Sequence, residues 1–139
     1  HKFKGPIIRG KKPKSNLLKT ASLYLNSPYL WGGKTPLGID CSGLTQMTYR
    51  INGYNIPRDA SQQVKLGETL SFIDESEAGD LAFFDNEEGE IIHVGLLLEN
   101  HFILHAHGQV RIDKIDQTGI YNVDSMKHTH RLRLIKKII

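Results

Sequence analysis

The only cysteine of this chain, Cys41, stands directly before a stretch that predicts a helix. A thiol becomes a good nucleophile when it loses its proton, which free cysteine does at a pH of about 8.5. At a helix start, unpaired backbone N–H groups favour negative charge, so they promote the thiolate and can hold an oxyanion. A small buried apolar side chain is the alternative, but the flanking residues Asp40 and Ser42 are polar. We therefore predict that Cys41 is a nucleophile, provided that a base lies near it.

Two histidines, His93 and His105, can supply that base. They stand in residues 90–99 and 101–107, two apolar runs that we expect to pair as an antiparallel hairpin. A three-residue loop over residues 98–100 would set them directly opposite each other on one face, with Cβ atoms about 4.5–5.5 Å apart. His93 could then take the thiol proton, and His105 could orient its ring, as in a nucleophile–base–orienter triad.

A zinc site is the competing interpretation of these histidines. His105 and His107 are two residues apart, so they share a face of a strand, and His93 could complete a three-histidine site. This interpretation leaves Cys41 unexplained, and a histidine among Ile, Val and Leu is also common as a hydrogen-bonded structural residue. We expect no metal or other cofactor. The histidines that we place on the surface are His101, His128 and His130.

Three helices are predicted in the first half of the chain. The first begins after Ser15, a typical N-cap. Its apolar face comprises Leu17, Leu18, Ala21, Tyr24 and Leu25. The second spans residues 41–51, with Asp40 as its cap, Asn52 and Gly53 as its stop, and a third, shorter helix lies within residues 58–67. The residues of the second helix that we expect to point inward are Leu44, Met47 and Thr48.

The second half of the chain has the character of β-strands. Residues 79–84, 90–99, 101–107, 109–112 and 130–139 are apolar or alternating, and turn-forming segments such as 85–90 and 99–101 connect them. Because helices come first and strands second, we predict an α+β domain in which N-terminal helices pack on an antiparallel β-sheet.

Length and composition exclude several classes of protein. With 139 residues, 39% of them hydrophobic and 24% charged, the chain is typical of one globular domain. One cysteine excludes an internal disulfide, and no apolar run is long enough to span a membrane. Much of the net charge of +3 lies at the two ends without a basic stripe between them, which argues against nucleic-acid binding. We predict a basic linker or arm over residues 1–14, one domain over residues 15–139, and a monomer.

Six motifs in order resemble the NlpC family of bacterial cell-wall cysteine peptidases, which are papain-like in fold. They are PYLWGG, IDCSGLTQ, IPRDASQQ, EAGDLAFF, IHVGLLLEN and ILHAH. The resemblance runs from about residue 15 to the C-terminus and implies Cys41 as nucleophile, His93 as base and His105 as the polar third member. It also implies hydrolysis of peptidoglycan stem peptides between γ-D-glutamate and a diamino acid such as diaminopimelate.

The resemblance further implies a set of substrate contacts. Tyr29 and Trp31 would line the cleft, and Ser42 would lie beside the carboxylate of D-glutamate. Asp59 is similar to the carboxylate that pairs with a free N-terminal L-alanine in some members, which would favour released muropeptides. The expected contacts are Tyr29, Trp31, Asp40, Ser42, Arg58 and Asp59, although for Arg58 we favour pairing with an internal carboxylate or carbonyl.

Family members of this kind also tend to carry SH3-like domains upstream, so the basic arm could lead to one. The cell envelope is the favoured location, with cytoplasmic recycling of wall fragments as the alternative. The competing function is a non-catalytic module that binds stem peptides. Retention of all three triad residues argues against such a module, because an idle cleft needs none of them.

Overall fold

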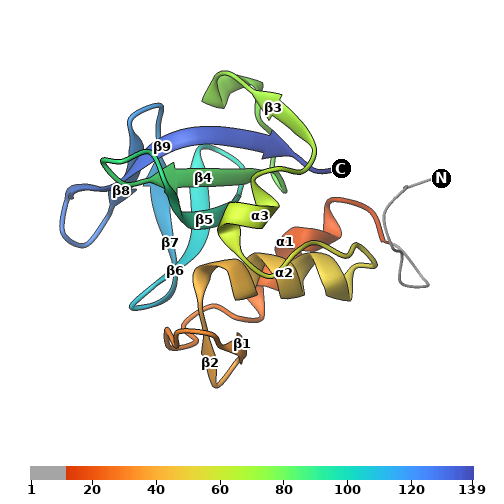
Figure 1. The fold of residues 1–139 in the computed structure, drawn as a ribbon. Helices are drawn as coiled ribbons and strands as arrows, with labels where there is room; N and C mark the ends of the chain where they lie inside the picture. The colour runs from red at the N-terminus through yellow and green to blue at the C-terminus, as the bar shows by residue number, and fades with distance from the viewer. Residues whose placement is uncertain (1–11) are drawn as a thin grey trace.

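The computed structural model describes residues 12–139, so most of the arm predicted for residues 1–14 lies outside the described residues (Figure 1). In chain order the elements are α1 (Asn16–Ser22), β1 (Lys34–Thr35), β2 (Gly38–Ile39), α2 (Cys41–Ile51), α3 (Ala60–Gln63), β3 (Glu68–Leu70), the 3₁₀ helix η1 (Ile73–Glu75), β4 (Leu81–Asp85), β5 (Ile91–Leu97), β6 (Phe102–His107), β7 (Gln109–Ile115), β8 (Gly119–Asn122) and β9 (Lys127–Lys137). This order confirms the α+β prediction. Within residues 12–139, no helix is long and apolar enough to cross a bilayer.

The main sheet closes into a barrel. Its seven antiparallel strands have the order β3-β9-β4-β5-β6-β7-β8, and β8 also pairs with β9. Strands β4 to β9 therefore form a closed ring, and β3 extends it along the end of β9 (Figure 1). The prediction of a simple sheet was incomplete because it lacked β8, the strand that carries the closing pairs. Closure leaves few unpaired strand edges.

Strand alternation divides the core between the two faces of this sheet. One cluster lies between the sheet and the helices, and the other fills the barrel. The first cluster includes Leu17, Leu44, Val94, Leu96 and Leu104, and the second includes Phe84, Leu97, Ile103, Ile115 and Ile120. Burial of each large apolar side chain stabilises the fold by about 1.5–3 kcal/mol. His93 and His105 have the strand parity of Leu97 and Ile103, so their rings point toward the end of the barrel interior.

Helix α2 has the predicted bounds and the predicted cap. The Asp40 side chain accepts a hydrogen bond from the Gly43 N–H at 2.7 Å, which satisfies a donor of the first turn. A side chain at position 43 would collide with the backbone oxygen of Gly33, so glycine lets the preceding loop pack against the helix start. Gly53, with φ of 93°, follows the C-cap residue Asn52. Of the residues predicted to point inward, Leu44 and Thr48 are buried and Met47 is partly buried.

Helices α1 and α3 are shorter than predicted. After Ser22 the chain continues with turns whose N–H groups bond three residues back, and this tighter winding leaves Leu25 38% exposed instead of buried. Leu17 and Ala21 are buried as predicted. Ser15 is the N-cap residue of α1, as predicted, but its side chain makes no capping hydrogen bond.

The β5–β6 hairpin sets the relation of the two histidines. Leu97 pairs with Ile103, and the Leu98 N–H bonds to the Phe102 carbonyl, so the three-residue turn covers residues 99–101, one residue later than predicted. In this register His93 and His105 share a face but are offset by two residues, so the prediction that they lie directly opposite was wrong. Gly95 lies opposite His105, and a Cβ there would come within 2.6 Å of Ile103 Cδ1 and 3.1 Å of the His105 Cβ. Glycine at this position therefore makes room for the side chains of Ile103 and His105.

Candidate active site

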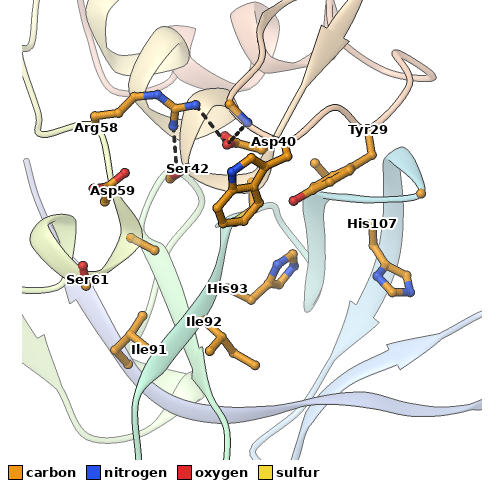
Figure 2. Close-up of a pocket in the computed structure, with 16 residues that line it drawn as sticks. Tyr29, Asp40, Ser42, Arg58, Asp59, Ser61, Ile91, Ile92, His93 and His107 are labelled. Carbon is orange, nitrogen blue, oxygen red and sulfur yellow. Dashed lines mark hydrogen bonds and ion pairs between the residues drawn. The ribbon is translucent and has the colours of Figure 1, made fainter.

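A pocket of about 720 Å³ lies between the start of α2 and strands β5 and β6 (Figure 2). Its lining includes Cys41, His93 and all six expected substrate contacts, Tyr29, Trp31, Asp40, Ser42, Arg58 and Asp59. The other lining residues are Gly32, Ala60, Ser61, Ile91, Ile92, Ala106, His107 and Gly108. His105 lies behind His93. The structure thus gathers residues that span positions 29–108 around one cavity.

The Cys41 thiol is partly buried at the first position of α2. Burial raises its pKa and outweighs the backbone N–H groups of Val94, Ser42 and Cys41 itself, whose hydrogen bonds lower it. The negative charge of Asp40 also raises it. We expected the helix start to acidify this thiol, but desolvation acts more strongly here than the helix terminus. The resting group is therefore a thiol with backbone donors around its sulfur.

His93 is kept neutral by its surroundings. Its side chain is buried, and burial lowers the pKa of the imidazole well below its usual value, as do His130, His105 and His107. A protonated thiol and a neutral imidazole in one pocket are the pair that general-base activation of a nucleophile requires.

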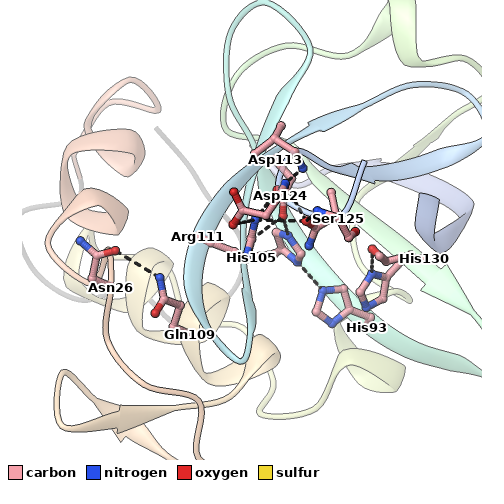
Figure 3. Close-up of polar contacts among 12 residues, drawn as sticks. Asn26, His93, His105, Gln109, Arg111, Asp113, Asp124, Ser125 and His130 are labelled. Atoms are coloured by element: carbon pink, nitrogen blue, oxygen red, sulfur yellow. Dashed lines mark hydrogen bonds and ion pairs between the residues drawn. The ribbon is translucent and has the colours of Figure 1, made fainter. Parts of the chain in front are cut away.

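A chain of hydrogen bonds sets which nitrogen of His93 can accept a proton. His93 Nε2 lies 2.9 Å from His105 Nδ1, and His105 Nε2 lies 2.7 Å from Asp113 Oδ2 (Figure 3). An ionised carboxylate only accepts, so His105 carries its proton on Nε2 and accepts at Nδ1. His93 then donates from Nε2, which leaves the lone pair of its Nδ1 free. That nitrogen is the one available for the thiol proton.

Asp113, on β7, was missed by the sequence analysis. It is fully buried, and Arg111 binds both of its oxygens, at 2.8 and 3.0 Å, while the Val123 N–H adds a third donor. Burial alone would raise its pKa, but hydrogen bonds from His105, Arg111 and Val123 outweigh it and hold the pKa well below its usual value. The predicted strand stopped at residue 112. Extending this strand by one residue would have placed Asp113 on the same face of the sheet as Arg111, which lies opposite His105.

His130 corrects a further expectation, because it does not lie on the open surface. It pairs with Ile120 across β8 and β9, and its ring stacks on that of His93 with centroids 4.1 Å apart and planes at 22°. Burial lowers its pKa to about 4, with repulsion from His105 and His107 as further causes. His101 and His128 are exposed, as predicted. The closure of the barrel, which the sequence did not show, turns His130 inward.

Asp40 and Arg58 organise one wall of the pocket (Figure 2). Arg58 donates to Asp40 Oδ2 and to Ser42 Oγ, both at 2.9 Å, and the Gly32 N–H donates to the same Asp40 oxygen at 2.9 Å. The Asp40 carboxylate is buried and is occupied by these internal bonds. The internal pairing expected for Arg58 is confirmed, and it holds the Ser42 hydroxyl in place.

Tyr29, Trp31 and Asp59 lie at the rim of the pocket. The Tyr29 N–H donates to the Gly108 carbonyl at 3.0 Å, which attaches this loop to the β6–β7 turn. Burial and then the charge of Cys41 raise the pKa of the Tyr29 hydroxyl, so it stays protonated within electrostatic reach of the thiol. Trp31 is 84% exposed, and the Asp59 carboxylate is also exposed. Trp31 and Asp59 are thus open to a ligand, and Asp59 is also the N-cap residue of α3.

Iodoacetamide is expected to alkylate Cys41 slowly at neutral pH and faster as the pH rises through and above about 8.5, the ordinary thiol value. The reason is that burial raises the thiol pKa, so little thiolate exists at lower pH. The measurement is the pH dependence of the alkylation rate, with the same protein unfolded in urea as the control. A high, flat rate between about pH 5 and 7 would instead reveal a thiolate–imidazolium pair.

Comparison with known proteins gives a consistent result. The model of the NlpC/P60 family matches residues 26–130. A Bacillus subtilis (strain 168) gamma-D-glutamyl-L-lysine dipeptidyl-peptidase is 42% identical over 103 residues, covering 73% of this chain and 34% of that protein. Dipeptidyl-peptidase 6 of Lysinibacillus sphaericus is 39% identical over 115 residues, covering 80% of this chain and 40% of that protein.

Among solved structures, an NlpC/P60 family protein from Bacillus cereus ATCC 10987 superposes with a TM-score of 0.76 at 25% identity. The match covers 92% of this chain and 41% of that one. The chain thus spans less than half the length of the curated relatives described above.

Proposed function

Because this chain belongs to the NlpC/P60 family, we propose that it is a cysteine peptidase that cleaves peptidoglycan stem peptides between γ-D-glutamate and a diamino acid. The observation that carries the proposal is the hydrogen-bond chain from Asp113 through His105 to His93, which leaves a proton acceptor in the pocket that Cys41 lines. The names of two relatives support the bond, since both describe dipeptidyl-peptidases and one specifies γ-D-glutamyl-L-lysine.

In the proposed reaction, His93 Nδ1 takes the thiol proton while the Cys41 sulfur attacks the γ-carbonyl carbon of D-glutamate. The backbone N–H of Cys41 and the Tyr29 hydroxyl hold the oxyanion of the tetrahedral intermediate. His93 then gives its proton to the leaving amine of the diamino acid, and the C–N bond breaks to leave a thioester. Water attacks the thioester, His93 takes a proton from that water, and the thiol reforms. In this papain-like scheme, His105 and Asp113 position the base.

The same pocket suggests where the substrate's charged groups bind. We assign the α-carboxylate of D-glutamate to the Ser42 hydroxyl, which Arg58 orients from behind. We assign the free ammonium of L-alanine to Asp59, whose exposed carboxylate lies on the same side of the pocket as Arg58 (Figure 2). Asp40 and Trp31 complete this wall, Asp40 through its internal bonds and Trp31 through its open aromatic face.

The direct test is mass analysis of products from defined muropeptides. We expect L-Ala-γ-D-Glu to be released from tripeptides with diaminopimelate or lysine, and little release when the alanine amine is acetylated. Products cut at any other bond, or no products from any member of the panel, would contradict the proposal.

Asp59→Asn is expected to lower kcat/KM for free-amine tripeptides about 10-fold to 100-fold, because a charge-assisted hydrogen bond to the substrate ammonium is lost. The rate on the N-acetylated peptide should barely change, so the preference for the free amine should shrink. Glu87→Gln removes an exposed carboxylate outside the pocket and serves as the matched control. An equal loss on both peptides would refute a role for Asp59 in amine recognition.

We also propose that residues 1–14 link this domain, residues 15–139, to an upstream module such as an SH3-like domain, and that the protein acts in the cell envelope as a monomer. The greater length of the relatives supports a multidomain arrangement. The mildly charged domain has no feature that favours nucleic acid as a partner.

A further inference from the structure

Three imidazoles meet where the barrel interior opens toward the pocket. His93, His105 and His130 come from β5, β6 and β9, and each offers a ring nitrogen within 4.8 Å of the other two (Figure 3). His93 and His105 are buried, and His130 is partly buried. We infer that these three residues form a binding site for Zn²⁺ that competes with the hydrogen bond between His93 and His105.

The hydrogen bonds around the cluster orient two of its nitrogens as zinc ligands require. His105 donates from Nε2 to the Asp113 carboxylate at 2.7 Å, so its Nδ1 lone pair faces the cluster. A carboxylate behind a histidine is the usual partner of a metal-bound imidazole, because it sets the tautomer and strengthens the ligand. His130 Nδ1 is held by Thr129 Oγ1 at 2.8 Å, which leaves its Nε2 for a metal. His93 Nε2 supplies the third ligand.

One pair of ligand nitrogens already has nearly the spacing that zinc needs, and the third ring must reorient. Tetrahedral ligands at Zn–N distances of about 2.0–2.1 Å are about 3.3 Å apart. His93 Nε2 and His105 Nδ1 are 2.9 Å apart, close to that value. The His130 ring, stacked at 4.1 Å on His93, must tilt toward the other two. His107 is exposed and lines the pocket, and its ring centroid lies 5.0 Å from that of His130. Zinc ions, and a water molecule as the fourth ligand, can therefore reach the three histidines from the pocket.

Zinc at this site would stop the proposed reaction without touching the thiol. A metal on His93 Nε2 displaces the proton from that nitrogen to Nδ1, because a neutral imidazole keeps one proton. Nδ1 then has no lone pair with which to accept the thiol proton. This inhibitory effect depends on the proposed function, whereas zinc binding itself does not.

The test measures Zn²⁺ binding by competition with a chromophoric chelator, and activity separately. The wild type and Cys41→Ala should each bind one Zn²⁺ with similar affinity, since the thiol is not a ligand. His130→Phe keeps an aromatic ring against His93 and should weaken binding at least about 100-fold, the upper end of the cost of losing a ligand's hydrogen-bond partner. His128→Ala, an exposed histidine on the same strand, is the matched control and should bind like the wild type. Zinc should inhibit the wild-type peptidase reversibly, and His130→Phe should resist it relative to its own zinc-free rate.

Three results would overturn the inference. Unchanged zinc affinity in His130→Phe would show that His130 is not a ligand. Loss of binding in Cys41→Ala would place the metal on the thiol instead. Activation by zinc would show that the metal takes part in the reaction. If the protein cleaves no stem peptide, the binding data still decide the zinc site, so its failure and that of the proposed function can be told apart.

Discussion

Cys41→Ala is expected to lower kcat/KM for L-Ala-γ-D-Glu-diaminopimelate about 10⁴-fold to 10⁶-fold, approaching the loss in kcat of about 2 × 10⁶ that follows removal of the nucleophile of a serine-protease triad. The chain has no second thiol that could replace it. The side chain is partly buried and Cys41 is the first residue of α2, where Asp40 and not the thiol makes the cap. The variant should therefore fold, with a melting temperature close to that of the wild type.

Peptide binding separates this prediction from the alternative of a non-catalytic module. Calorimetry should show that Cys41→Ala still binds the tripeptide, because Ser42, Arg58 and Asp59 are intact. Cys41→Ser, which keeps the shape but supplies a much weaker nucleophile, should be nearly as inactive as the alanine variant. Turnover at the wild-type rate in Cys41→Ala would refute the peptidase mechanism. Binding without turnover in the wild type itself would instead identify a module that only recognises stem peptides.

The parts of the site that depend on local signals could be predicted from the sequence. The helix start at Cys41 and its cap at Asp40 follow from residues that are neighbours in the chain, and α2 has the predicted bounds. The shared face of His93 and His105 follows from an even sum of paired positions, and the sum stays even because the turn keeps three residues. The exact register could not be predicted in this way, because it depends on the residue at which the turn begins, and the turn begins at 99 instead of 98.

The parts that depend on the closure of the barrel could not be predicted. His130 reaches His93 only because β8 pairs with β9, and β8 has just four residues and no strong alternation. Asp113 reaches His105 through the β6–β7 register, in which Arg111 lies opposite His105. The prediction of a lowered pKa for the Cys41 thiol was wrong for a related reason. Burial by strands distant in the sequence raises this pKa more than the local helix start lowers it. Tertiary contacts thus decide the electrostatics of this site.

Asp113→Asn is expected to lower kcat by about 10²-fold to 10⁴-fold, with the upper value set by the equivalent change in the serine-protease triad. The Asn amide can donate to His105 Nε2, which would move the His105 proton to Nδ1. His93 would then accept at Nε2 and carry its own proton on Nδ1, where it cannot receive the thiol proton. The effect passes through one more imidazole than in the serine proteases, so a wide range is expected.

This variant should also be less stable at neutral pH, because Arg111 loses its buried ionised partner. The pKa of Asp113 is lower in the folded protein than in the unfolded chain, so its contribution to stability is present at neutral pH and is lost as the pH falls below about 4. The melting temperatures of the variant and the wild type should therefore converge in acid. Activity is compared well below both melting temperatures at neutral pH.

Asp124→Asn is the matched control, because Asp124 also binds Arg111, at 2.8 Å, but is exposed and makes no contact with His105. It should keep nearly full activity.

Nitrogen-15 chemical shifts of the imidazoles report the tautomers directly. In Asp113→Asn the protonated nitrogen should change from Nε2 to Nδ1 in His105, and from Nε2 to Nδ1 in His93 as well. A structural role alone would reduce stability without moving these shifts. Unchanged tautomers, or an equal loss of kcat in Asp124→Asn, would show that Asp113 does not set the proton position, and the base would then have to be oriented by His105 alone.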